Sequence, residues 1–326
     1  MNRLITVEET KELIASGQCL SLAGAECLLD QLPAGNWIGG TTPYFITEDG
    51  GVVSQDMIFA TTLSELGQAS VAHFAAEELA GICANAPENG FALTIIPAGS
   101  KAHKNFAADA GNFEGAFLRP TVGWIAGVHL SELGHSTPKV YDGRGPHKYE
   151  DMAVVAYVAL PEDKLASIEI INLFEPEEGD VLRFHDTNFE VDECEVNGER
   201  TNFSEYIRQR GLDHGHLPLV GDFGGAHLNV SLQHVASDHG KTQLYAPVFA
   251  GVDYRFAKPV TDYAAAFQVR LNEQQAQGQV MSCNCILNFV FGDLEGKSIG
   301  GLAGPVTFGE IAYQLLNQTL VVLRIH

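Results

Sequence analysis

Glu310 is the residue whose place in the sequence points most directly to chemistry. It follows Gly309, whose missing side chain lets a ligand or a strand approach the backbone, and its other neighbours are apolar. A carboxylate in such core-like sequence must be paired or hydrogen-bonded, because its burial is otherwise costly. Asn317 and Thr319 are close enough in sequence to donate to it or to a ligand. We expect these four residues to bind a ligand; alternatively, Glu310 braces the loop Gly300–Gly304 by accepting its backbone amides.

A second candidate site lies in the segment Asn36–Ile46, NWIGGTTPYFI, where two glycines and two threonines interrupt β-type sequence. Gly39 and Gly40 permit close approach to the backbone, and the hydroxyls of Thr41 and Thr42 lie beside them. We expect these four residues to contact a ligand as well. The alternative is a bulge or bend that binds nothing.

Histidines offer a third kind of chemistry, because His214-Gly-His216 could chelate a metal such as zinc from a loop. Further nitrogen and oxygen ligands are present nearby in the sequence: Asp213, Asp222, His227, His234, Asp238 and His239. These residues straddle several turns, and no helix supplies two histidines at i,i+4 spacing. Hydrated surface histidines are therefore the alternative to a metal site.

Cysteine could supply a nucleophile. Cys283 would serve a hydrolase if a distant histidine reached it in space, since catalytic triads assemble in the fold rather than in the sequence. However, no pair among the six cysteines has the C-x-x-C spacing of a zinc or redox site. Buried, reduced thiols are the simpler interpretation.

Composition and missing motifs exclude several classes of function. The chain has 19 basic and 41 acidic residues, a net charge of −22, which repels phosphate backbones and anionic membranes. It contains no P-loop, no dinucleotide fingerprint and no G-x-S-x-G elbow. The longest apolar run, Met152–Pro161, is about half a membrane span, and acids stand where a signal peptide would be apolar. We expect a cytoplasmic protein with no cofactor, no nucleic-acid partner and no membrane partner.

The elements that must position these residues are short strands and a few helices. A capping box at Thr6 predicts a helix that ends at Gly17. Hydrophobic periodicity and turn signals predict helices over Ser70–Cys83, Asn202–Gln209 and Pro259–Gln277, and buried strands over Phe91–Pro97, Val122–Val128 and Val280–Phe291.

These elements predict an α/β (α+β) fold of two packed halves. Each half is expected to be a mixed, largely antiparallel β-sheet covered by helices, because many short strands with few crossover helices argue against a purely parallel sheet. The segment Leu173–Gly179, LFEPEEG, breaks the β pattern with a proline and three acids. We therefore expect domains over residues 1–175 and 176–326.

The C-terminal run TFGEIA…LLNQTLVV resembles the closing signature of the FIST C-terminal domain, in which a Gly-Glu pair precedes an Asn-x-Thr strand. The glycine-rich segment Asn36–Ile46 resembles a strand of the FIST N-terminal domain. The resemblance implies a FIST N-terminal-like domain over 1–175 and a FIST C-terminal-like domain over 176–326.

The chain departs from the FIST pattern at two places. The C-terminal domains tend to carry Cys-x-x-Arg on the preceding strand; here Cys283 is present, and the resemblance makes it a ligand-binding candidate, but Ile286 replaces the arginine. The N-terminal domains carry an acid at the end of a glycine-rich strand. In this chain Val122–Val128 is followed by His129 and later by Glu132.

FIST domains are regarded as bacterial intracellular sensory modules for small ligands. The resemblance therefore implies a cytoplasmic signal-transduction protein that binds a small metabolite and, having no output domain of its own, acts on a separate partner protein. An enzyme remains the alternative, either a hydrolase using Cys283 or one using a metal at His214–His239. A heme-based gas sensor is a further alternative, because one branch of the family binds heme.

Overall fold

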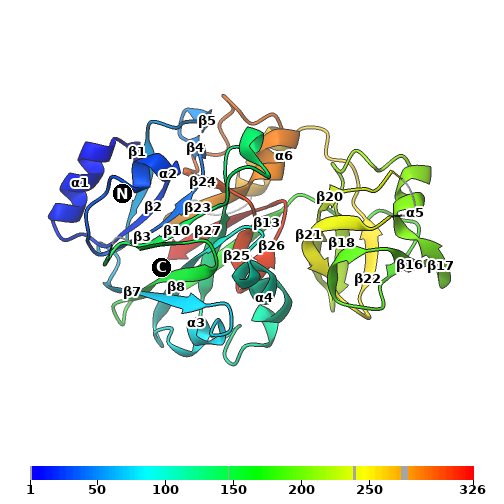
Figure 1. Ribbon diagram of the computed structural model, residues 1–326, viewed down its shortest axis with the longest axis horizontal. Helices are drawn as coiled ribbons and strands as arrows, with labels where there is room; N and C mark the ends of the chain where they lie inside the picture. The colour runs from blue at the N-terminus through cyan, green and yellow to red at the C-terminus, as the bar shows by residue number, and fades with distance from the viewer. Residues whose placement is uncertain (1, 146, 238–239, 273–277) are drawn as a thin grey trace. The chain divides into compact units, whose positions relative to one another are not determined.

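The computed structural model describes residues 2–145, 147–237, 240–272 and 278–326, and its contacts divide the chain into two compact units. The first unit comprises Met1–Ile171, Ala264–Leu315 and Thr319–His326, and the second comprises Asn172–Tyr263 and Leu316–Gln318. Figure 1 shows the C-terminal strands, in orange and red, in the same unit as the blue N-terminal strands.

The units are therefore not the consecutive segments 1–175 and 176–326. The chain enters the second unit after Ile171, a few residues before the expected boundary, but it returns to the first unit at Ala264. The physical reason is strand pairing across the whole chain. The strand β24, Gly304–Thr307, pairs with β4, Tyr44–Thr47, and so joins the C-terminal segment to the N-terminal one.

Among the described residues, three six-stranded sheets form the first unit (Figure 1). In spatial order, the first sheet contains β1 (Asn2–Ile5), β6 (Ile58–Thr62), β2 (Leu20–Gly24), β3 (Trp37–Thr41), β10 (Val140–Asp142) and β11 (His147–Tyr149). The second contains β26 (Gln314–Leu316), β25 (Glu310–Ala312), β9 (Thr121–Ala126), β8 (Gly90–Pro97), β12 (Met152–Ala159) and β7 (Gln68–Ala75). The third contains β13 (Ala166–Asn172), β27 (Thr319–Ile325), β23 (Gln279–Cys285), β24, β4 and β5 (Gly50–Val53).

Short helices connect these strands. They are α1 (Val7–Ala15), α2 (Glu26–Leu29), α3 (Ala80–Ala84), α4 (Lys101–Asp109), α6 (Tyr263–Asn272), α7 (Ile286–Phe291) and the 3₁₀ helices Ala110–Asn112 and Leu130–Glu132. The helix α1 begins with the predicted capping box, in which Thr6 and Glu9 each accept from the other's backbone amide.

In the part of the second unit that the structure describes, there are two antiparallel sheets and α5, Phe203–Gln209. The larger sheet orders β17 (Glu199–Asn202), β16 (Glu193–Val196), β14 (Leu182–Arg183), β22 (Asp253–Phe256), β18 (Leu219–Phe223) and β19 (Ala226–Val230). The smaller orders β15 (Asn188–Val191), β21 (Thr242–Val248) and β20 (Leu232–His234). In the described registers, strands pair in parallel at three places, β2–β3, β8–β9 and β23–β24, and antiparallel elsewhere. The predicted α/β fold class with mixed, largely antiparallel sheets is therefore confirmed.

Two predicted elements are wrong, and the start of a third is shifted. The segment Ser70–Cys83 is not a helix: β7 pairs with β12 over eight residues, and only Ala80–Ala84 is helical. The apolar strand β12 needs a neighbour on both sides, and this tertiary pairing outweighs the helical spacing of the apolar residues. The strand predicted over Val280–Phe291 ends at Cys285, where α7 begins. The helix predicted from Pro259 starts at Tyr263, and its residues 273–277 lie outside the described part of the chain.

Close packing between the first two sheets explains one conspicuous glycine. Strands β3 and β10 pack against β8 and β12. At Gly40 in β3, an added Cβ would lie 2.6 Å from Cη2 of Trp124 and 2.7 Å from Cγ2 of Ile95. The close approach that Gly40 permits is therefore an approach by core side chains.

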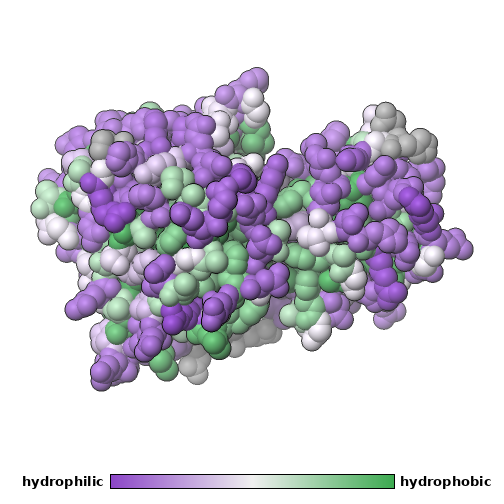
Figure 2. All heavy atoms as spheres, turned by 60° about the horizontal axis from the view of Figure 1, so that its bottom comes forward, coloured by the Kyte–Doolittle hydropathy of each residue, from purple (hydrophilic) through white to green (hydrophobic). Residues whose placement is uncertain are grey.

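Hydrophilic residues cover most of the face shown in Figure 2, and hydrophobic residues form smaller patches on it. The exposed large hydrophobic side chains of the described chain include Phe117, Leu118 and Leu165. Among the helices of the described residues, none is both long enough and apolar enough to cross a membrane.

The packing at Gly40 predicts that Gly40→Ala lowers the free energy of unfolding by about 1–3 kcal/mol, the usual cost of overpacking a core. Urea unfolding measures this loss. Gly111→Ala is the matched control, because its added Cβ would meet no atom closer than 3.6 Å. Equal stabilities for the two variants would contradict the predicted packing.

Candidate functional site

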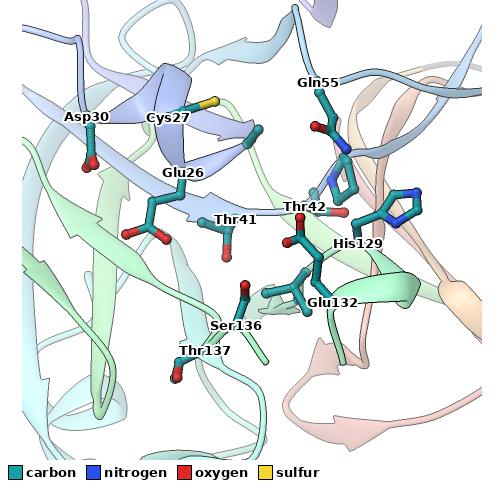
Figure 3. A pocket seen from close by; sticks show the side chains of 14 residues that line it. Glu26, Cys27, Asp30, Thr41, Thr42, Gln55, His129, Glu132, Ser136 and Thr137 are labelled. Atoms are coloured by element: carbon teal, nitrogen blue, oxygen red, sulfur yellow. The ribbon is translucent and has the colours of Figure 1, made fainter. Parts of the chain in front are cut away.

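A pocket of about 340 Å³ lies at the carboxyl ends of β2, β3 and β9, within the first unit. Its lining comprises Ala25, Glu26, Cys27, Asp30, Thr41, Thr42, Pro43, Gln55, Gly127, Val128, His129, Glu132, Ser136 and Thr137 (Figure 3). We call it the carboxyl-edge pocket. The ends of strands in α/β sheets are common ligand sites, because loops there can present side chains around a cavity.

Two sheets meet at this pocket through backbone hydrogen bonds. The amide of Gly127, just beyond β9, donates to the carbonyl of Thr41 at the end of β3, with N and O 2.8 Å apart. The amide of Thr42 donates to Gly24 at the end of β2 over 3.1 Å. Gly127 is required here because an added Cβ would lie 1.9 Å from the ring of Phe308. The ends of three strands are thus fixed around one cavity.

The two threonines that the sequence singled out form the inner wall of the pocket. Thr42 is fully buried, and its hydroxyl donates to the carbonyl of Val306 in β24 over 2.7 Å. The hydroxyl of Thr41 accepts from the amide of Lys139 over 3.0 Å. The Thr42 hydroxyl also accepts from the amide of Tyr44 over 3.3 Å, so this buried side chain shapes the wall, and Thr41 holds a fixed position beside it.

Two of the acidic side chains in the pocket are already paired. Glu26 and Asp30 lie four residues apart around α2, and both contact Lys148 Nζ at 2.7 Å. Lys139 Nζ lies 3.7 Å from Glu26 and 2.9 Å from Glu150. These lysines fix the two acids and reduce the negative charge on that side of the pocket.

Glu132 differs from the other two acids. In Figure 3 its carboxylate extends into the pocket, with the side chains of Thr41 and Ser136 between it and Glu26. Its side chain is exposed and has no ion pair or hydrogen bond with any residue that the structure describes. Glu132 is thus available to a ligand.

His129 is held by its own loop. Its ring stacks on Tyr44, with centroids 5.6 Å apart, and Nδ1 accepts from the amide of Ser131 over 3.3 Å at the start of a 3₁₀ helix. The Ser131 hydroxyl lies 2.7 Å from the same nitrogen. Because Nδ1 accepts a backbone proton, the neutral ring carries its own proton on Nε2.

Glu310 is fully buried at the start of β25. One of its oxygens accepts from Thr319, from the hydroxyl over 2.8 Å and the amide over 3.2 Å, and the other from the Thr307 hydroxyl over 3.2 Å. Burial raises the pKa of Glu310 to about 8, although hydrogen bonds from Thr319, Thr307 and Cys285 favour the charged form and oppose the shift.

These contacts describe a brace, though of a different segment from the loop Gly300–Gly304. Glu310 binds residues of β24 and β27. In β24, the residue before Thr307 is Val306, whose carbonyl holds Thr42 in the pocket wall. Glu310 is not among the residues that line the carboxyl-edge pocket, but it acts on this wall through one strand.

The remaining predicted site residues lie in other surroundings. Gly309 has a φ of +154° and accepts from the amide of Ile125, so it serves the junction of β9 and β25. Cys283 is buried, its thiol donates to the carbonyl of Gly123 over 3.3 Å, and burial followed by the Glu310 charge raises its pKa. At neutral pH this sulfur is a thiol rather than a nucleophilic thiolate.

Asn317 belongs to the second unit, where its carbonyl accepts from Asn229 over 3.1 Å. Gly39 lies within β3, where an added Cβ would meet the ring of Trp37 at 3.1 Å. The structure thus places Thr41 and Thr42 on the pocket and groups Glu310 with Thr319 in the interior. Gly39, Gly40 and Asn317 are absent from the lining of that pocket.

The histidine cluster does not assemble among the described residues. His214 and His216 lie with ring centroids 4.9 Å apart, and the backbone amide of His216 donates to Nδ1 of His214. Within the described ranges, no group of three or more His, Cys, Asp or Glu side chains is arranged to hold a metal ion. Asp238 and His239 lie outside the described residues.

Sequence reasoning missed most of the pocket lining. Glu26 and Cys27 begin α2, two residues after β2 ends, and Asp30 follows α2, whereas Ser136 and Thr137 precede β10. A position near the end of a predicted strand is the one sequence signal that these residues share. It does not reveal which strand ends lie together in the fold. In the sequence, His129 and Glu132 stand out only as a departure from the FIST pattern.

The buried carboxyl predicts a pH dependence of stability. The folded-state pKa of about 8 exceeds the ordinary value of 4.5, so between these values the unfolded chain releases a proton that the folded chain retains. The contribution of Glu310 to stability is therefore complete below about pH 4.5 and falls by about 1.4 kcal/mol per pH unit up to about pH 8.

Glu310→Gln removes this titration, so its stability relative to the natural chain should improve as the pH rises from 5 to 8. Urea unfolding at several pH values measures the two slopes. Glu162→Gln, at an exposed acid, is the control and should keep the natural slope. If Glu310→Gln also kept it, the proposed ionisation behaviour would be wrong.

Comparison with known proteins supplies a family but no activity. No curated protein matches the chain. This leaves the resemblance to FIST domains a prediction. One protein-family model covers nearly the whole chain, residues 5–326, and the protein therefore belongs to that family, DUF6976, a family of unknown function.

Proposed function

We propose that the protein is a non-catalytic module that binds a small polar molecule in the carboxyl-edge pocket. The observation that carries this proposal is the convergence of three strand ends on one cavity that contains the predicted residues Thr41 and Thr42. Its volume of about 340 Å³ falls within the range of small-molecule sites, which is about 300–1,000 Å³.

The polar lining supports a binding role. Thr41 and Thr42 are fixed by backbone partners, and Glu26 is fixed by Lys148, so the wall is organised before a ligand arrives. A preorganised wall reduces the entropic cost of ordering side chains on binding. Glu132 and Ser136, which are exposed, provide groups that a ligand can engage.

The surroundings of the candidate nucleophile and base favour binding over catalysis. Cys283 is buried as a thiol against Gly123, away from the pocket lining. His129, the imidazole in the pocket, uses Nδ1 to cap its own 3₁₀ helix. A nucleophile needs a base within hydrogen-bond reach. Cys283 contacts a backbone carbonyl instead, and the Ser131 hydroxyl that lies 2.7 Å from Nδ1 of His129 is not part of the pocket lining.

We propose further that binding serves signalling, as the resemblance to FIST domains implies. In this proposal the protein is cytoplasmic, it senses a metabolite, and it passes the signal to a separate partner protein. The exposed hydrophilic surface and the net charge of −22 support a protein that moves freely in a crowded aqueous compartment.

Blocking the pocket should abolish binding. Ser136 is exposed, and in Figure 3 its hydroxyl points toward Thr41, so Ser136→Trp places a large ring in the cavity. A metabolite at about 100 times its Kd should stabilise the natural protein by about 2.7 kcal/mol and leave Ser136→Trp unchanged. A thermal-shift screen followed by calorimetry measures this effect.

Ser70→Trp is the matched control, because Ser70 is an exposed serine on β7 outside the pocket, and this variant should keep the full ligand-induced shift. A metabolite that stabilises Ser136→Trp as strongly as the natural protein would place the binding site elsewhere. A broad panel in which no metabolite binds would also contradict the proposed function.

A further inference from the structure

We propose that the ligand of the carboxyl-edge pocket is a small hydroxylated amine, such as an amino sugar or an amino alcohol, whose ammonium group pairs with Glu132. This inference rests on the proposed function and adds the chemical class of the ligand. Three properties of the lining support it: the sign of its charge, the state of each acid, and the supply of hydroxyl groups.

The charge of the pocket favours a cation. Its lining contains three acids, Glu26, Asp30 and Glu132, and neither lysine nor arginine. The lysines Lys139 and Lys148 contact Glu26 from outside the lining, and Lys139 is shared with Glu150. Three carboxylates, including that of Glu150, share these two ammonium groups. Glu132 contacts neither of them, so negative charge remains at the cavity.

Glu132 is the acid that a ligand cation can pair with. Lys148 contacts both Glu26 and Asp30, and the hydroxyl of Tyr141 also donates to Asp30 over 2.9 Å. A ligand ammonium near those two carboxylates would compete with a protein cation. At Glu132 it would meet a carboxylate without any partner in the described residues, and it could form a charge-assisted hydrogen bond without displacing a protein cation.

The other lining groups suit hydroxyls on the same ligand. The side chains of Thr41 and Ser136 lie between Glu26 and Glu132 in Figure 3, and Thr137 and Gln55 also line the cavity. Hydroxyl and amide groups both donate and accept, so they can bind ligand hydroxyls in either direction. A purely apolar amine would leave these groups without partners, which lowers affinity.

An anionic ligand is disfavoured by the same features. A ligand carboxylate or phosphate would lie near Glu132 without a lysine or arginine in the lining to bind it. The net charge of −22 also repels anions at long range and attracts cations, so it favours the encounter of an amine with the pocket.

Matched pairs of compounds test the role of the ammonium group. Calorimetry at low ionic strength compares glucosamine with glucose, mannosamine with mannose, and serinol with glycerol, and glucuronate serves as the anionic probe. At least one amine should bind about tenfold more tightly than its neutral counterpart, the scale of one charge-assisted hydrogen bond. Higher salt should reduce this preference.

Glu132→Gln should remove the preference for the amine. The substitution keeps the shape of an exposed side chain that has no described hydrogen bond, so the variant should fold like the natural chain. Glu162→Gln changes the net charge by the same amount at an exposed acid outside the pocket and should retain the preference.

The outcomes separate the two proposals. If no amine binds more tightly than its neutral counterpart, or if Glu132→Gln retains the preference, the inference about the amine is wrong. The proposed function would still hold if a neutral or anionic compound bound the natural protein and the Ser136→Trp substitution abolished that binding. If neither these probes nor the wider metabolite panel bind, both proposals fail.

Discussion

The burial of one carboxyl group constrains the architecture around the candidate site. Glu310 lies at the start of β25 without contact to solvent, and such a group is tolerated only where donors surround it. Thr307 and Thr319 supply the donors and thereby connect β25 to β24 and β27. The carbonyl of Val306 in β24 also accepts from the hydroxyl of Thr42. The hydrogen bonds to Glu310 and the position of the pocket wall therefore depend on the same strand.

Glycines provide the complementary constraint, because they bring backbones and rings closer than any other residue would allow. Gly40 leaves room for Trp124 between the first two sheets, and Gly127 leaves room for Phe308 beside the pocket. The resulting approach brings the ends of β2, β3 and β9 to one cavity. The glycines thus fix the shape of the site, whereas the side chains that can contact a ligand lie mostly on the segments that follow the strands.

Local signals were sufficient for part of this structure. The capping box at Thr6 and the helix Asn202–Gln209 depend on neighbours in sequence, and both were predicted. The apolar spacing of Ser70–Cys83 predicts a helix, but pairing with β12 makes the first part of this segment a strand. The link between Glu26 and Lys148 spans 122 residues, so no local pattern could reveal it. For the same reason Thr41 and Thr42 could be singled out, but not the acids and hydroxyls that complete their pocket.

Selective modification of Cys27 tests most directly whether the carboxyl-edge pocket is the ligand site. Cys27 lines that pocket and is exposed, whereas the other five cysteines are buried, so a maleimide should react with this thiol first. If the carboxyl-edge pocket is the ligand site, a saturating ligand slows modification of Cys27 severalfold and the modified protein no longer binds the ligand. An unchanged rate of modification, together with full ligand binding by the modified protein, would contradict it.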